Sequence, residues 1–257
     1  MPGPFYVLTV SGSDSSGGAG LQADNRAILA ADAFPLNVIT AVTVQTSAGV
    51  RAVQSVPADF VARQLHELLQ AYPVAAVKSG MLVDVEIVEV LASAFEMYPR
   101  VKYVCDPVLR ASSGRSLLTS DGVALLREQL MPRAILTTPN LEELAILSGQ
   151  TEPDLSAGQT LAQELGQAIL LKGGHASGSE CSDWLIRPDA EPQCFNAPRI
   201  QSKNTRGTGC ALASGIAARI AQGVPLSMAI ENAKAQLQES LQAHIGEDWT
   251  GDGPGFL

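Results

Sequence analysis

Basic residues are scarce in this 257-residue sequence, which has 17 Lys and Arg against 26 Asp and Glu. The resulting formal charge of −9 excludes the broad basic surface with which proteins bind nucleic acids. An anionic substrate would therefore have to be bound by a few local groups. Long apolar runs are also missing, since none approaches the ~18 residues that a membrane span needs. We expect neither a nucleic-acid partner nor a membrane span.

Cysteine is rarer still, with four residues, and its spacing excludes two kinds of site. Cys105, Cys181, Cys194 and Cys210 form no CxxC pair and have no histidine at metal-ligand spacing. In a chain of this size they are best interpreted as reduced cytosolic thiols. The sequence enters an apolar run without a basic leader or a cleavage site, so we expect no signal peptide. These features predict a cytoplasmic protein.

The two commonest nucleotide-binding motifs are absent as well. The glycine-rich stretch Ser11–Gly20 has Gly18 after Gly17, where a Walker A loop needs lysine, and it contains no GxGxxG spacing. The later Gly207–Gly209 turn also fails the dinucleotide pattern, because Leu212 occupies the place of the third glycine. A nucleotide would have to be bound by a different loop.

Strand-like and helix-like segments alternate along most of the chain, and several strands are apolar throughout. This arrangement predicts an α/β fold with a mostly parallel sheet covered by helices on both faces. No linker divides the chain, so we expect one domain over residues 1–257 with an irregular tail over about 246–257. The predicted strands are Phe5–Val10, Leu36–Val44, Val74–Ser79, Val101–Cys105, Ala134–Thr138, Ala168–Leu171 and a hairpin within Ser182–Ile200. The predicted helices are Leu21–Ala33, Pro57–Tyr72, Asp84–Met97, Ser120–Gln129, Leu141–Ser148, Leu155–Leu165, Thr208–Gln222 and Leu226–His244.

Polar and glycine residues follow most of these strands. In an open parallel sheet, ligands bind beyond the carboxyl ends of the strands. Phosphoryl transfer needs a cation for the phosphates, oxygen ligands for Mg²⁺ and N–H donors for the developing charge. The strand ends supply all three kinds of group: Gly12, Asp14, Gln45, Gly80, Met81, Asp106, Asn140, Lys172, Gly173 and Gly174.

The stretch Lys203–Ile216 carries the strongest single signal. A glycine-flanked threonine precedes a helix of small residues, and the N–H groups at such a helix start bind anions. Cys210 falls in the first helical turn, where the pKa of a thiol tends to be lowered. We therefore predict that Gly207–Cys210 is the phosphoryl-transfer centre of a small-molecule kinase.

Each of these residues also has a purely structural interpretation. Gly207–Cys210 alone is equally typical of a loop–helix junction, and Asp106 before a proline is typical of a turn. Asn140 with Glu143 forms a predicted capping box, which is compatible with a second role. Lys172 has the interpretation of a solvated rim lysine. The convergence of the four signals at strand ends favours the functional interpretation.

The recognisable motifs are Ser11–Asp14, Ser16–Asp24, Ile39–Thr43 before Gln45-Thr46, Val77-Lys78, Gly80–Leu82, Asp106–Val108, Thr138–Leu141, Lys172–His175, Lys203–Thr205 and Gly207–Cys210. Together they make the chain, from about Leu8 to Ala243, resemble the hydroxymethylpyrimidine/phosphomethylpyrimidine kinases of thiamine biosynthesis. These kinases belong to the ribokinase-like superfamily. The resemblance implies phosphorylation by ATP of 4-amino-5-hydroxymethyl-2-methylpyrimidine, and then of its monophosphate to the diphosphate. It also implies a homodimer.

The resemblance further assigns roles to positions of this chain. The pyrimidine would be bound by Gly12, Asp24, Gln45, Met81 and Val108, although a solvated helix acid is the alternative for Asp24. Mg²⁺ or its waters would be held by Asp106, Asn140 and Glu143. ATP would be bound by Lys172, Asn204, Thr205, Gly207 and Gly209. The residues expected to be catalytic are Lys172, Gly207, Thr208, Gly209 and Cys210, with Cys210 where many superfamily relatives carry an aspartate base.

The chain also departs from the family pattern. Arg206 replaces the usual histidine, Ala211 the usual threonine and Ser112 the usual lysine, and Ser79 replaces a larger residue. We expect Arg206 to offer its charge to a phosphate. The alternatives are a kinase of a related alcohol, such as pyridoxine or a pyrimidine analogue, and a non-catalytic pyrimidine-binding protein.

Overall fold

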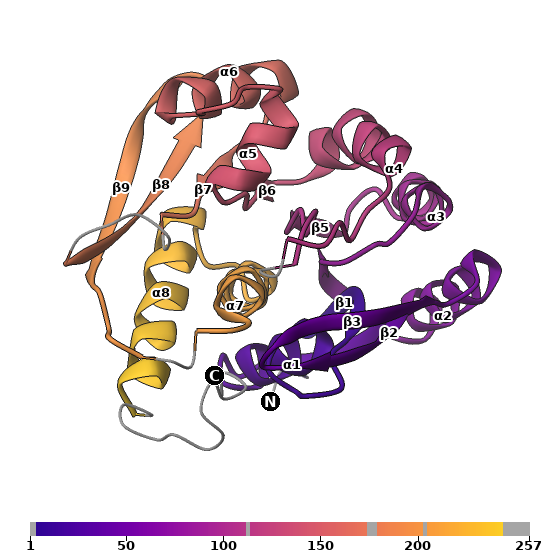
Figure 1. The fold of residues 1–257 in the computed structure, drawn as a ribbon. Helices are drawn as coiled ribbons and strands as arrows, with labels where there is room; N and C mark the ends of the chain where they lie inside the picture. Colours follow the sequence, from indigo (N-terminus) through magenta and orange to yellow (C-terminus); the bar gives the residue numbers. More distant parts are fainter. Residues whose placement is uncertain (1–3, 112–113, 174–178, 203–204, 244–257) are drawn as a thin grey trace.

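The central feature of the computed structural model is one large sheet. The structure describes residues 4–111, 114–173, 179–202 and 205–243, and within them nine strands pair in the order β3-β2-β1-β4-β5-β6-β7-β8-β9. The inner pairs from β2 to β7 are parallel, whereas β3, β8 and β9 join antiparallel at the two edges. The predicted mostly parallel α/β fold is therefore confirmed (Figure 1). The strands are β1 (Tyr6–Ser13), β2 (Phe34–Thr46), β3 (Gly49–Ser55), β4 (Val74–Ser79), β5 (Lys102–Cys105), β6 (Leu136–Thr137), β7 (Ile169–Leu171), β8 (Glu180–Arg187) and β9 (Ala190–Pro198).

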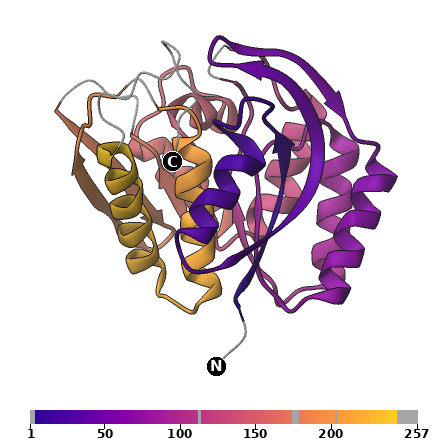
Figure 2. The same ribbon diagram turned by 90° about the horizontal axis from the view of Figure 1, so that it is seen from below.

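Helices cover both faces of the sheet (Figures 1 and 2). Alternating strand residues divide the core into two apolar clusters: Leu8 and Val10 of β1 pack toward one face, and Val7 packs toward the other. The Leu8 face is covered by α2 (Ala58–Ala71), α3 (Val85–Met97), α4 (Ser120–Leu125), α5 (Leu141–Ser148) and α6 (Leu155–Leu165). The Val7 face is covered by α1 (Gly20–Leu29), α7 (Thr208–Ala221) and α8 (Leu226–Ala243).

Helix α7 lies in the middle of its layer, and its sequence of small residues makes this position possible. Every residue from Ala211 to Ala218 is buried, so the helix has no solvent-facing side along this stretch. A Cβ added to Gly215 would lie 3.4 Å from the Cβ of Ala233 on α8. The close packing fixes the middle of α7 against α8.

The structure corrects several predicted boundaries. The predicted strands lack β3, which follows β2 after a two-residue turn and has no fully buried residue to give an apolar signal. Helix α1 ends at Leu29 instead of Ala33, where the chain turns and Asp32 adopts a φ of 55°. The helix predicted to Gln129 changes after Leu125 into a π-type turn. The predicted hairpin is present as β8 and β9, and the predicted irregular tail lies outside the described residues.

Candidate active site

The carboxyl ends of β5 and β7 meet the N-terminus of α7, as the sequence predicted. Asp106 follows β5 and Lys172 follows β7, and the Lys172 Nζ lies 2.9 Å from the Asp106 Oδ1. A Cβ added to Gly209 would lie 3.3 Å from the same Nζ. One ammonium group therefore contacts both a strand-end carboxylate and the first turn of the helix, and its side chain is largely buried.

Five charged side chains form a continuous series across this edge of the sheet, which we call the charge chain. It consists of Asp24, Lys78, Asp106, Lys172 and Glu143. Successive N–O distances are 2.8, 3.7, 2.9 and 3.6 Å. Sequence reasoning gave Lys78 no role, although a lysine near the end of an otherwise apolar strand was an available signal. Its side chain is 0% exposed, which makes it the best shielded cation of the series.

Asp24 is not a solvated helix acid, so that alternative is wrong. Its side chain is 0% exposed, and its Oδ1 accepts hydrogen bonds from the Lys78 Nζ at 2.8 Å and the Ser214 Oγ at 2.7 Å. The Oδ2 has no hydrogen-bond partner among the described residues. Burial raises the pKa of Asp24, and Lys78 opposes that rise. A buried carboxylate oxygen without a partner is suited to a ligand donor.

Both lysines of the charge chain are held as cations. Burial alone would lower the pKa of Lys78, but Asp24 together with other nearby acidic groups, Asp106 among them, outweighs burial and raises that pKa. Burial would likewise lower the pKa of Lys172, and Asp106 and Glu143 raise it above its ordinary value. The carboxylates thus keep two ammonium groups charged in a largely dry environment.

The predicted capping box at the start of α5 is confirmed. The Asn140 Oδ1 accepts a hydrogen bond from the Glu143 N–H at 2.8 Å, and the Glu143 Oε2 accepts one from the Asn140 N–H at 2.8 Å. Burial raises the pKa of Glu143 to about 7, with Lys172 opposing the rise and Asp106 adding to it. Glu143 therefore titrates close to neutral pH while it caps the helix.

The predicted magnesium residues could bind Mg²⁺ if water and phosphate oxygens supply its remaining ligands. Within the described part of the chain, no group of three or more His, Cys, Asp and Glu side chains can hold a metal ion by itself. Asp106 and Glu143 nevertheless lie on either side of Lys172, and their mutual repulsion contributes to the high pKa of Glu143. Mg²⁺ in phosphate sites commonly uses one or two carboxylates and keeps several waters. The single side-chain oxygen of Asn140 already accepts the capping hydrogen bond, whereas each carboxylate has a second oxygen, so Asp106 and Glu143 are the better candidates.

Three of the predicted pyrimidine-binding residues lie together. Met81 packs with Ala41 and Leu117 in a small apolar cluster that Val108 borders. A Cβ added to Gly12 would overlap the Met81 Cε, so Gly12 lies directly against the flexible end of that side chain. Gln45 lies near the end of β2, where its backbone N–H donates to the Ser15 Oγ at 2.9 Å and its carbonyl oxygen accepts a hydrogen bond from the same hydroxyl at 2.9 Å.

The Gly207–Gly209 turn has the geometry expected of an anion-binding helix start. Gly207 adopts a φ of 77°, and a Cβ added to it would overlap the Gly18 carbonyl oxygen. No side chain caps the helix, and the Thr208 Oγ1 instead donates to the Thr205 carbonyl oxygen at 3.0 Å. The turn is therefore in contact with the glycine-rich loop after β1. The predicted ATP residue Asn204 and the departure at Ser112 lie outside the described residues.

Cys210 lies beside this turn, but the predicted lowering of its pKa is wrong. Burial raises the pKa of the Cys210 thiol to about 11, and the nearby Lys78 lowers it only in part. The helix N-terminus and the two lysines stabilise the thiolate less than the loss of hydration destabilises it. Cys210 is thus a neutral thiol near pH 7 in this structure, and all four cysteines are free.

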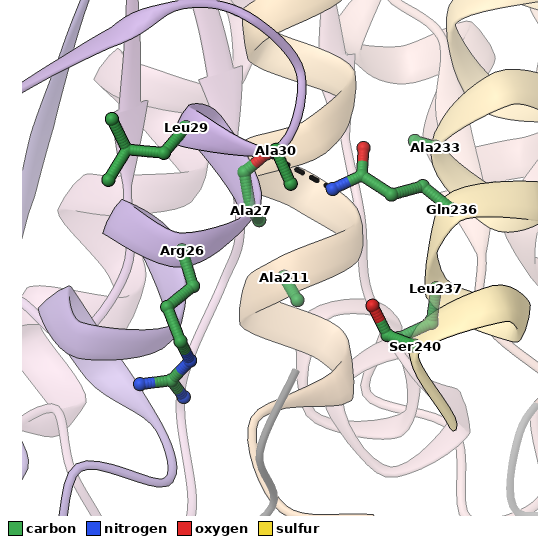
Figure 3. A pocket seen from close by; sticks show the side chains of 9 residues that line it. All are labelled: Arg26, Ala27, Leu29, Ala30, Ala211, Ala233, Gln236, Leu237 and Ser240. Atoms are coloured by element: carbon green, nitrogen blue, oxygen red, sulfur yellow. Dashed lines mark hydrogen bonds between the residues drawn. The ribbon is translucent and has the colours of Figure 1, made fainter. Parts of the chain in front are cut away.

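A cavity of about 350 Å³ lies away from this site, between α1, α7 and α8 (Figure 3). Small side chains such as Ala27, Ala211 and Ala233 line it, with Arg26 at one side. The Gln236 Nε2 donates to the Ala27 carbonyl oxygen at 3.3 Å. None of the predicted site residues lines this cavity. Each helix in the described part of the chain is too short or too polar to span a bilayer.

Comparison with known proteins agrees with this geometry. The family described as phosphomethylpyrimidine kinase matches residues 14–254. A hydroxymethylpyrimidine/phosphomethylpyrimidine kinase of Escherichia coli is 40% identical over 96% of this chain and 95% of its own length. A thiamine biosynthesis bifunctional protein of Geobacter sulfurreducens is also 40% identical, and this chain spans 49% of it. The pyridoxal kinase of Staphylococcus aureus in complex with AMP-PCP and pyridoxal superposes with a TM-score of 0.86 and 25% identity, covering 98% of this chain and 92% of that one.

Proposed function

The chain belongs to the phosphomethylpyrimidine kinase family, and we propose that it phosphorylates 4-amino-5-hydroxymethyl-2-methylpyrimidine and then its monophosphate with ATP. The observation that carries this proposal is the Lys172 ammonium group. It lies 2.9 Å from the Asp106 carboxylate and contacts the first turn of α7. A cation, a carboxylate and a row of helix N–H groups at one point are the parts that phosphoryl transfer requires. The identity of the acceptor in this proposal rests on the names of the relatives.

In this proposal the residues of the chain act by positioning and charge. Lys172 would bind the ATP phosphates, and the N–H groups of Gly207, Thr208 and Gly209 would stabilise charge on the transferred group. Asp106 and Glu143 would hold Mg²⁺ or its waters. When bound, the ion would neutralise phosphate charge.

The acceptor would lie against Gly12, Met81 and Val108, with Gln45 and the free Oδ2 of Asp24 binding its polar groups. Cys210 remains the proposed base. Since its pKa is about 11, it can accept a proton only in the fraction of molecules in which Lys78 and Lys172 hold it as a thiolate.

We also propose that residues 1–257 form one kinase domain, that two copies form a homodimer and that the enzyme works in the cytoplasm. The family relationship supports these assignments. Size-exclusion chromatography with light scattering measures the copy number directly, and a monomeric mass at assay concentration would contradict the dimer.

A coupled assay of ADP release tests the activity with three acceptors: the hydroxymethylpyrimidine, its monophosphate and pyridoxal. The last is included because a pyridoxal kinase is a structural neighbour. We expect the two pyrimidines to be the better substrates. Lys172→Met should abolish ADP release, whereas Lys102→Met is a matched control, since the Lys102 Nζ donates to the Ile220 carbonyl oxygen at the far end of the sheet. Tight pyrimidine binding without ADP release would instead identify a binding protein.

A further inference from the structure

Arg206 does not point its charge at open solvent, as an arginine awaiting a phosphate would. Its Nη2 lies 3.0 Å from the Asp14 Oδ2, and its Nη1 donates to the Ser16 Oγ at 3.2 Å. The side chains of Arg206 and Asp14 are only 15% and 2% exposed. From the sequence we expect Arg206 to offer its charge to a phosphate. In the structure its guanidinium group is already paired with Asp14 and Ser16.

Asp14 is the organising residue of the glycine-rich loop that follows β1. Its Oδ1 accepts hydrogen bonds from the N–H and the hydroxyl of Ser16, at 2.9 and 2.8 Å. Its Oδ2 accepts one from the Ala19 N–H at 2.8 Å, directly before α1 begins at Gly20. The carboxylate therefore holds both ends of the loop, and Arg206 binds to the same oxygen as Ala19.

The residue after Arg206 contacts the same loop. Gly207 lies so close to Gly18 that a Cβ would overlap the Gly18 carbonyl oxygen. The guanidinium pairing and this backbone contact join the glycine-rich loop, residues 14–19, to the phosphate-binding turn, residues 205–209. The two segments are almost two hundred residues apart in sequence.

We propose that Arg206 is a positioning residue that locks the phosphate-binding turn onto the glycine-rich loop and so sets the place of the helix N–H groups. This inference rests on the proposed function, because it assigns Arg206 to the same reaction. Arg206 acts through Asp14 and does not touch the nucleotide. The glycine-rich loop continues from Gly12, which borders the predicted pyrimidine pocket, so the lock also couples acceptor binding to ATP binding.

The test compares Arg206→Ala, Arg206→Lys, Asp14→Asn and the Asp14→Asn/Arg206→Ala double variant. Displacing a binding group by about 1 Å can lower turnover efficiency by roughly a hundredfold. We therefore expect kcat/KM for ATP to fall by about 10- to 100-fold in Arg206→Ala, with a smaller loss in Arg206→Lys. Asp14→Asn should show a similar loss, and the double variant should lose little more than either single variant.

A direct phosphate contact makes the opposite prediction for Asp14. If Arg206 binds a phosphate, Asp14→Asn releases the guanidinium group, and ATP affinity stays the same or rises. That result would overturn the lock. A merely structural role is tested by adding guanidinium ion at low millimolar concentration. The ion should restore kcat/KM severalfold in Arg206→Ala only, since a general loss of stability does not respond in this way.

Arg187→Ala is the matched control, because Arg187 lies at the end of β8, outside the site. Its Nη2 donates to the Oγ of Ser227 on α8 at 2.8 Å. It should keep wild-type KM for ATP and gain nothing from guanidinium. The affinity for AMP-PCP, measured by calorimetry without acceptor, is a second readout of the contact between Arg206 and Asp14. If no pyrimidine is turned over, the proposed function fails while this measurement still tests Arg206. Unchanged AMP-PCP affinity together with unchanged kcat/KM in Arg206→Ala would overturn the inference.

Discussion

The buried lysine of the charge chain gives the sharpest prediction on stability. Lys78→Met keeps the length of the side chain but leaves Asp24 and Asp106 without their shared cation. Removing one partner of a buried ion pair costs about 3–5 kcal/mol, because the remaining charge stays desolvated. At about 2–4 °C per kcal/mol for a chain of this size, we expect the melting temperature to fall by about 6–20 °C.

The loss of stability in Lys78→Met should depend on pH in a defined direction. Burial already raises the pKa of Asp24, and without Lys78 that pKa rises further. A carboxyl group whose folded pKa exceeds its unfolded value of about 3.9 takes up a proton on folding, so its folded state gains stability as the pH falls. Urea unfolding of Lys78→Met should therefore show a larger deficit near pH 8 than near pH 5.

Two variants make this prediction decisive. Asp24→Asn/Lys78→Met removes both charges and should recover more than half of the lost stability. Lys102→Met removes a lysine that donates to the Ile220 carbonyl oxygen, and it should lose much less. A Lys78→Met protein within about 1 kcal/mol of wild type, or a deficit independent of pH, would refute the electrostatic reasoning.

Four further predictions concern the candidate site. The alkylation rate of Cys210 by iodoacetamide, measured against Cys210→Ala, should keep rising to about pH 10, since its pKa is about 11; a plateau near neutral pH would contradict this. Cys210→Ala should also lower kcat at least about a hundredfold if the thiol is the base. Gly207→Ala should lower both kcat and stability, whereas Gly223→Ala, with a similar φ of 84° and open space around it, should lose only about 1–2 kcal/mol in a melting experiment. For Glu143→Gln, the increase in Mg²⁺ affinity expected between about pH 6 and pH 8 should disappear in a titration of activity against Mg²⁺, because Glu143 with a pKa of about 7 would no longer titrate.

The sheet could be predicted because its strands are apolar runs that end at turn residues. Val74–Ser79 was found with its observed bounds, since six residues alternate between two buried faces and stop at Gly80. Strand β3 could not be found in the same way. Its residues Arg51 and Ala52 are exposed, and its place is fixed by pairing with β2, which is a tertiary contact.

The proximity of the strand-end residues could be predicted from the sequence, and their electrostatics could not. Strand ends located Asp106 and Lys172, because chain direction alone places them at one edge. The thiol pKa was predicted in the wrong direction, since a helix start is visible in the sequence but burial is not. Lys78 escaped for a related reason: its partner Asp24 lies 54 residues earlier, on a helix that only the fold brings to it.

The tight packing of α7 has a consequence for changing what the enzyme accepts. Because Ala211–Ala218 are buried on every side, the helix cannot slide or tilt to make room for a bulkier acceptor. Diversity introduced into α7 would mostly produce proteins that do not fold. A library aimed at new acceptors should instead vary Gln45 and Val108, which are only partly buried, and leave the helix untouched. The rigid helix then serves as a fixed reference point, and the proposed pyrimidine-binding residues Gln45 and Val108 provide the freedom for selection.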